Sequence, residues 1–99
     1  MNTLLTLKAL ANDKRLQILM WLKEPQQHFV SSHCDVGTDG VCVGLIEQKS
    51  GLSQSTVSQY LLQLQQAELI SMERRGQWTF CKLKPDSIRT LLNTLQQLL

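Results

Sequence analysis

The sequence has few of the features that mark an enzyme, a secreted protein or a membrane protein. Its 99 residues include only five aromatic side chains, two prolines and three cysteines. No apolar run approaches the roughly 18 residues that a membrane-spanning helix needs. The N-terminus has no basic segment followed by an apolar core and a cleavage site, so no secretion signal is predicted. No GxSxG, P-loop, HExxH or GxGxxG motif is present. These absences argue against catalysis, secretion and membrane insertion.

The composition is that of an ordinary folding domain with a slight excess of positive charge. Apolar residues make up 42% of the chain and charged residues 18%, and the formal net charge is +2. A chain of this length forms one domain and buries only about 60–65% of its unfolded surface, so a monomer is marginally stable. The charge permits binding to nucleic acid without requiring it. Three cysteines without a secretion signal indicate free thiols in a reducing compartment.

The first 42 residues contain two amphipathic segments followed by a less regular stretch. Leucines at helical spacing predict a helix over residues 3–11, and Asn12 or Asp13 then caps a second helix that ends at Glu24, before Pro25. Residues 25–42 are rich in Ser, Gly, Asp and Thr and are predicted to form a long loop, with a short helical turn near its start.

The middle of the chain has the pattern of two helices joined by a tight turn. A helix is predicted over residues 43–50, Gly51 is suited to end it in a left-handed conformation, and Ser53 is suited to cap the next helix. The helix that follows, over residues 54–66, places Val57, Tyr60, Leu61 and Leu64 on one apolar face. This arrangement predicts a helix-turn-helix.

The hydrophobic period changes after this helix. Two strands are predicted within residues 70–83, joined by a turn at Arg75-Gly76-Gln77, and a leucine-rich helix follows from Pro85. The predicted fold is therefore mostly α with a small β-hairpin (α+β). The order helix-turn-helix, hairpin and helix is that of a winged helix, with residues 1–99 as a single DNA-binding domain.

The outer face of helix 54–66 is polar but carries no charge. A helix has the diameter to enter the DNA major groove, glutamine can bridge N6 and N7 of adenine, and serine or threonine can bind a base or a phosphate. The alternative is that this face is simply solvated. The side chains that would meet base edges are Gln54, Ser55, Thr56, Ser58 and Gln59.

Attraction to phosphate has to come from outside this helix, because residues 51–67 contain no charged side chain. The free N–H groups at the helix start favour anions. Arg74 and Arg75 at the hairpin tip, with Lys82 nearby, are candidates for phosphate or minor-groove contacts. The alternative is that these arginines only make the turn soluble.

The stretches GLSQSTVSQYLLQLQQAELI, RRGQWTFCKL and LKALANDKRLQILMWL resemble the ArsR/SmtB family of bacterial transcriptional repressors. The resemblance covers the chain except for roughly residues 25–41. It implies a homodimer that binds an operator palindrome in double-stranded DNA, in the bacterial cytosol and associated with the nucleoid, through helix 54–66 and wing residues 70–83. The DNA-binding residues expected on this basis are Ser53, Gln54, Ser55, Thr56, Ser58, Gln59, Gln63, Arg74, Arg75 and Gln77.

The first and last helices are the expected dimer interface. Both are apolar over an arc too wide for a surface helix of a monomer, so burial against a second copy is predicted. In a dimer, two recognition helices about 34 Å apart would reach successive major grooves. The residues expected in the interface are Leu4, Leu7, Leu91, Leu95 and Leu98.

The metal sites that the resemblance implies are incomplete. The family's Cys-x-Cys pair matches Cys42, but Gly44 stands where the second cysteine should be, and its Asp-x-His pair on the last helix matches Asp86, but Ile88 replaces the histidine.

His33, Cys34 and Cys42 remain as candidates. They could hold Zn(II) or another thiophilic ion, or the two thiols could form a disulfide as a redox switch. The alternative, which we favour, is that Cys42 is a small buried apolar residue and Cys34 an incidental loop thiol. Cys81, Trp21 and Trp78 are predicted to serve packing.

Two other functions are compatible with the same sequence. One is a winged-helix module that docks a protein partner and has no affinity for DNA. The other is a small thiol-dependent redox enzyme, which would need a cysteine of low pKa beside a base, an arrangement that only His33-Cys34 offers. An operator-binding regulator accounts for more of the sequence than either.

Overall fold

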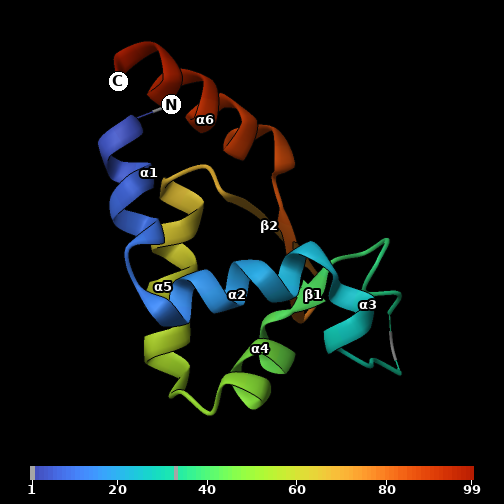
Figure 1. The fold of residues 1–99 in the computed structure, drawn as a ribbon. Helices are drawn as coiled ribbons and strands as arrows, with labels where there is room; N and C mark the ends of the chain where they lie inside the picture. Colours follow the sequence, from blue (N-terminus) through green and yellow to red (C-terminus); the bar gives the residue numbers. More distant parts are fainter. Residues whose placement is uncertain (1, 33) are drawn as a thin grey trace.

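A computed structural model describes residues 2–32 and 34–99 and confirms the winged-helix architecture (Figure 1). Its helices are α1 (Thr3–Leu10), α2 (Asp13–Lys23), α3 (Pro25–His28), α4 (Val43–Ser50), α5 (Gln54–Gln66) and α6 (Pro85–Leu98). Its strands are β1 (Val41–Cys42), β2 (Ile70–Arg75) and β3 (Trp78–Leu83). Within the described residues, no helix is both long and apolar enough to cross a bilayer.

The helix boundaries follow from capping residues that the sequence supplies. Asn2 Oδ1 accepts the Leu5 N–H at 3.0 Å, and Asn12 Oδ1 accepts two backbone N–H groups at the start of α2. Pro25 is the first residue of the short α3, where its missing N–H costs nothing. Gly51 closes α4 with a φ of 68°, a left-handed conformation that glycine adopts without strain.

The sheet contains one strand more than the sequence predicted. The expected hairpin is present, with Arg75 opposite Trp78 across the turn, and Gly76 has the positive φ that this turn requires. Val41 and Cys42, predicted to end a loop, form β1 and pair with β3 opposite Cys81 and Phe80. The prediction of a loop over residues 25–42 is therefore wrong at its last two residues. The strand order is β1-β3-β2.

The main core lies where α2, α4 and α5 meet the sheet. Its fully buried members include Ile18, Ile46, Leu61 and Leu69. Cys81 joins this core and is fully buried, which confirms its predicted packing role. Trp21 is also buried and meets the Phe29 ring edge-to-face, with ring centroids 6.0 Å apart.

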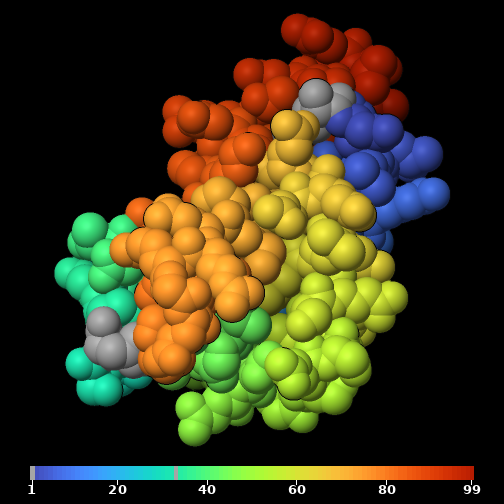
Figure 2. All heavy atoms as spheres, turned by 180° about the vertical axis from the view of Figure 1, so that it is seen from behind, coloured from blue at the N-terminus to red at the C-terminus, as the bar shows by residue number. Residues whose placement is uncertain are grey.

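Helices α1 and α6 lie together at one end of the molecule, with both chain termini (Figure 1). Two hydroxyl groups tie them to the end of α5. Thr6 Oγ1 donates to the Ala67 carbonyl at 3.3 Å, and Ser87 Oγ donates to the Glu68 carbonyl. The wing, α4 and the start of α5 lie at the other end, side by side on one face (Figure 2).

Candidate nucleic-acid interface

Helix α5 has a buried apolar face and a largely polar exposed face. Val57, Leu61 and Leu64 are fully buried in the core. Gln54, Ser55, Ser58 and Gln59 are exposed, and Thr56 is half-buried at the edge of the polar face. The anchored face fixes the orientation of the helix, so the polar face is a rigid surface that a groove can accept.

The start of α5 is held by three hydroxyl groups. Ser53 Oγ accepts the Thr56 N–H at 3.2 Å and donates to Thr56 Oγ1 at 2.8 Å. It also lies 3.3 Å from Ser55 Oγ. This N-cap confirms the helix start predicted from Ser53 and orders the first turn, which carries Gln54 and Ser55.

Gln63, which we expected among the DNA contacts, lies apart from this face. It is half-buried and lines a hollow of about 190 Å³ between α1, the start of α2 and α5, together with Leu5, Lys8 and Arg15. Its Oε1 atom is enclosed and has no hydrogen-bond partner within the described part of the chain. On the α5 helix it lies at the side of the polar face that is nearest α1.

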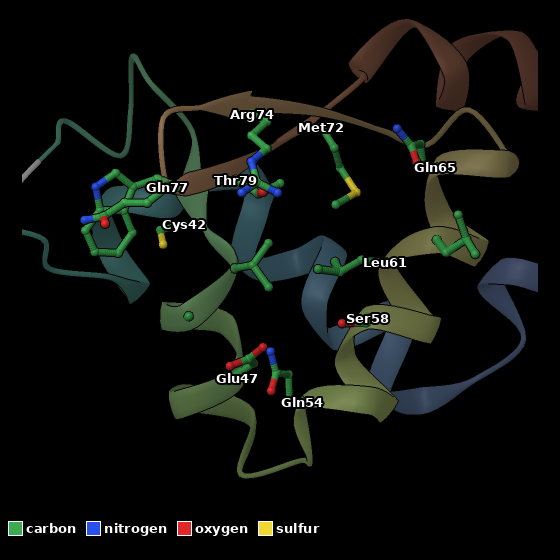
Figure 3. Close-up of a pocket in the computed structure, with 14 residues that line it drawn as sticks. Cys42, Glu47, Gln54, Ser58, Leu61, Gln65, Met72, Arg74, Gln77 and Thr79 are labelled. Atoms are coloured by element: carbon green, nitrogen blue, oxygen red, sulfur yellow. The ribbon is translucent and has the colours of Figure 1, made fainter.

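A groove of about 650 Å³ separates α5 from the wing (Figure 3). In the close-up, Gln54 and Glu47 point toward each other on one side, and Arg74 and Gln77 lie on the wing side. The walls of the groove also have apolar surface, which comes from Leu62, Met72 and Trp78. Leu62 is half-exposed in the middle of the polar face. The helical period places Leu62 on this face, but sequence reasoning did not count Leu62 or Glu47 among the functional residues, because neither fits a base-reading or phosphate-binding pattern.

The two wing arginines differ in what they contact. Arg74 Nε donates to the Gly76 carbonyl at 3.2 Å, within the turn, and the side chain lines the groove. Arg75 is bound by its own chain: Nη2 donates to the Asp39 carbonyl at 2.9 Å, and Nε lies 3.2 Å from a Glu73 carboxylate oxygen. The structure therefore leaves Arg74 better placed than Arg75 to reach a phosphate.

Of the three candidate sensor residues, the structure describes Cys34 and Cys42. Cys42 is buried in β1, Cys34 is half-buried with its Sγ 3.3 Å from Ser31 Oγ, and all three cysteines are free thiols. Burial raises the pKa of the Cys81 thiol to about 12, with a smaller contribution from nearby Cys42. His33 lies outside the described residues, and among the others no three side chains of the metal-binding kind gather. The sensor hypothesis gains no support from this geometry.

Some of the predicted dimer residues lie on the surface of the protomer, and others are buried in its interior. Leu4, Leu7 and Leu98 are exposed, and Leu95 is half-buried. Leu91 is only 4% exposed because α6 uses it to pack against its own chain, so it has little surface to offer a partner. Leu5 on α1, Leu92 on α6 and Leu99 just after α6 are also exposed.

Comparison with known proteins places this geometry among transcriptional regulators, although no family model matches the chain. It is 48% identical over 90 residues to the uncharacterized HTH-type transcriptional regulator YbzH of Bacillus subtilis, covering 90% of each chain. It is 33% identical over 92 residues to the putative arsenical resistance operon repressor ArsR2 of Halobacterium salinarum, covering 93% of this chain and 66% of that one.

Solved structures agree with these relatives. The crystal structure of NolR from Sinorhizobium fredii superposes with a TM-score of 0.63 at 34% identity, covering 93% of this chain and 78% of that one. HlyU from Vibrio cholerae superposes with a TM-score of 0.65 at 29% identity, covering 96% and 88%. With the helix-turn-helix and the wing in place, the chain belongs to the ArsR/SmtB family of winged-helix transcriptional regulators.

Proposed function

We propose that two copies of this chain, each a single winged-helix domain, bind an operator palindrome by inserting α5 into the major groove. The observation that carries the proposal is the exposed, uncharged face of α5, whose opposite face is fixed in the core. Gln54 and Gln59 are the residues proposed to read bases, and Ser55 and Ser58 to bind bases or phosphates. Arg74 and Gln77 are proposed to reach the backbone from the wing.

The proposed dimer forms through the exposed leucines of α1 and α6. These helices lie together at the end opposite the wing, and we propose that their exposed leucines form one apolar surface on which a second copy packs. The two copies would then present their α5 helices about 34 Å apart, in successive major grooves. The leucines proposed to form this surface are Leu4, Leu5, Leu7, Leu92, Leu95, Leu98 and Leu99.

A dimer would carry a formal net charge of +4, twice the +2 of one chain. Few phosphates are then neutralised, so affinity should fall with salt less steeply than for a strongly basic repressor. We place the protein in the bacterial cytosol, on the nucleoid, as a regulator and not an enzyme. We also propose that it represses, as ArsR2 is named to do, by occupying its operator. HlyU of Vibrio cholerae is named a transcriptional activator, so relatives include activators as well as repressors.

Selection of duplexes from a random pool, followed by salt titration of binding, tests the DNA-binding proposal. We expect a selected palindrome to bind at least 1,000-fold more tightly than random duplex, as is typical of specific sites. Absence of salt-dependent binding to any duplex at low ionic strength would overturn the proposal and favour a protein-docking module.

Light scattering after size-exclusion chromatography tests the dimer. Leu98→Glu should give monomers, because burying each leucine contributes about 1.5–3 kcal/mol and a buried carboxylate is costly. Met20→Glu is the matched control, since Met20 is 61% exposed on α2, outside the leucine surface, and Leu98 is 68% exposed. A wild-type monomer, or equal effects of both variants, would contradict the proposed interface.

A further inference from the structure

Arg75 is an exposed wing residue whose polar contacts reach beyond the hairpin to Asp39. A guanidinium has five N–H donors, and each of the three nitrogens of Arg75 already lies within reach of an oxygen of its own chain. Nη1 lies 3.4 Å from Asp39 Oδ1, Nη2 donates to the Asp39 carbonyl at 2.9 Å, and Nε lies 3.2 Å from Glu73 Oε1. Because arginine binds through a planar fork, this arrangement fixes the direction of the side chain.

One face of the same guanidinium is also covered. The carbon at its centre lies 4.3 Å from the centroid of the Phe80 ring, a distance typical of a cation–π contact. Phe80 is buried, and it points to the face of β3 opposite Cys81 and the main core. Arg75 therefore covers the Phe80 ring on the outer side of the sheet. Turning the arginine toward DNA would expose that ring.

The partner of Arg75 is held just as firmly. Asp39 Oδ2 accepts the Asp35 N–H at 2.9 Å, and the Asp39 N–H donates back to the Asp35 carbonyl at 2.7 Å. The bond from the Asp35 N–H and the neighbouring Arg75 guanidinium hold the pKa of the Asp39 carboxyl below its ordinary value, so this group is ionised at neutral pH.

The loop of residues 35–40 is positioned by the sheet that the wing belongs to. Gly40 has a φ of 98°, and a Cβ there would lie 2.8 Å from the Cys81 carbonyl oxygen, so only glycine allows the loop to pass this close to β3. The chain then enters β1, which pairs with β3. Asp39 is thus two residues from a strand hydrogen-bonded to the wing.

We propose that Asp39 and Arg75 form a brace that fixes the wing for DNA binding, so that Arg75 is a positioning residue and the loop of residues 35–40 affects DNA affinity without touching DNA. This inference rests on the proposed function. It also reverses the expectation from sequence, in which Arg75 binds phosphate directly. The two roles predict opposite effects of removing the Asp39 charge.

The decisive variant is Asp39→Asn, tested on the palindrome selected by the wild-type dimer. If Arg75 binds phosphate, the variant frees it, adds one positive charge and tightens binding. If the brace acts, binding weakens despite the added charge. We expect a loss of up to about fivefold, the limit set by an exposed ion pair. Glu73→Gln is the control, because it makes the same charge change beside Arg75 without disconnecting the loop, and it should not weaken binding. Unchanged or tighter binding by Asp39→Asn would overturn the brace.

A second pair of variants separates charge from geometry. Arg75→Lys keeps the charge but loses the planar fork, so it should weaken binding as much as Asp39→Asn does. Arg89→Lys is the matched control, because Arg89 is an exposed arginine on α6 outside the proposed DNA-binding residues, and this variant should bind like wild type. If Arg75→Lys binds like wild type, Arg75 acts only through its charge, and the brace is refuted.

Hydrogen exchange tests the brace without DNA and so distinguishes its failure from failure of the proposed function. In Asp39→Asn, amides of the wing turn and of residues 35–40 should exchange faster, while those of α5 keep the wild-type rate. Unchanged exchange in the wing would refute the brace even if DNA binding stands. Faster exchange, in a protein that binds no duplex, would support the brace as a structural tie and refute the proposed function.

Discussion

Helix α5 and the wing both carry exposed polar residues, but they differ in how far those residues are committed to the chain itself. The exposed glutamines of α5 belong to a helix whose backbone bonds itself, so their amides remain available to a ligand. The wing arginines instead bond to a turn carbonyl, a loop carbonyl and two carboxylates. Exposure alone therefore does not identify a residue that binds DNA.

The difference has a physical cause. A helix packed on one side satisfies its own N–H and C=O groups, apart from those at its ends. A hairpin tip has few internal bonds and little core beneath it, so long side chains such as Arg74 and Arg75 fold back to hold it. A recognition helix can thus present uncommitted groups, whereas a wing must use part of its surface to keep its own shape.

The largest expected effect is a loss of stability, and it separates the buried face of α5 from its exposed face. Leu61→Ala should lower the free energy of unfolding by about 2–5 kcal/mol, because it leaves a cavity beneath the helix. Leu62→Ala, next in sequence but half-exposed, should cost far less. Urea denaturation measures both. Similar losses would mean that α5 does not have one anchored and one free face.

The next effect concerns base reading by the free face. Gln54→Ala should weaken binding to the selected palindrome by about 1–3 kcal/mol, because a bidentate contact to a base is lost. Binding to random duplex should hardly change, and Gln17→Ala serves as the control, because Gln17 is exposed on α2 away from this face. Equal losses on both duplexes would show that Gln54 is not reading bases and would remove the contrast with the wing.

The next prediction concerns the pH dependence of stability that comes from the buried thiol of Cys81, on strand β3 of the wing. The pKa of Cys81 is raised to about 12 from an ordinary 9.0, so the thiol stays protonated in the folded protein while it ionises in the unfolded chain. Its contribution to stability is complete below pH 9 and is lost as pH rises toward 12. Cys81→Ala should show a shallower decline over this range than wild type. Parallel declines of wild type and Cys81→Ala, measured by urea denaturation, would contradict the burial of this thiol.

The smallest expected effect concerns Arg74, the wing arginine with fewer contacts to its own chain. Arg74→Ala should weaken binding to palindrome and random duplex alike, by about tenfold at most, and should reduce the salt slope by nearly one. Titrations at several salt concentrations measure both quantities. A loss confined to the palindrome would mean that Arg74 reads sequence, and that wing and helix are more alike than proposed.

The elements that could be predicted from sequence are those fixed by local chemistry. Asn12, Ser53 and Gly51 mark helix ends through interactions within a few residues, and the apolar period of α5 assigns its buried face correctly. Strand β1 could not be predicted, because two residues become a strand only through pairing with β3, about 40 positions later.

The same limit applied to the candidate sites. The bond from Arg75 to Asp39 spans 36 positions and has no local signal. The wide leucine stripe of α6 predicted burial but could not divide Leu91, packed inside the chain, from Leu98 on its surface. Gln63 lies at the border between the buried and exposed faces of α5. At such a position the helical period does not predict whether the side chain faces a neighbouring helix or solvent.

The hydroxyl bonds of Thr6 and Ser87 to the Ala67 and Glu68 carbonyls, just after α5, have a consequence for the proposed assembly. They attach both terminal helices to the C-terminal end of α5, whereas Gln54 and Ser55 lie at its other end. In the proposed dimer, the angle at which two copies meet would therefore set the direction of each α5 helix. The half-site spacing that such a dimer accepts would depend on its leucine contacts, and a small repacking there would misalign both helices with the grooves.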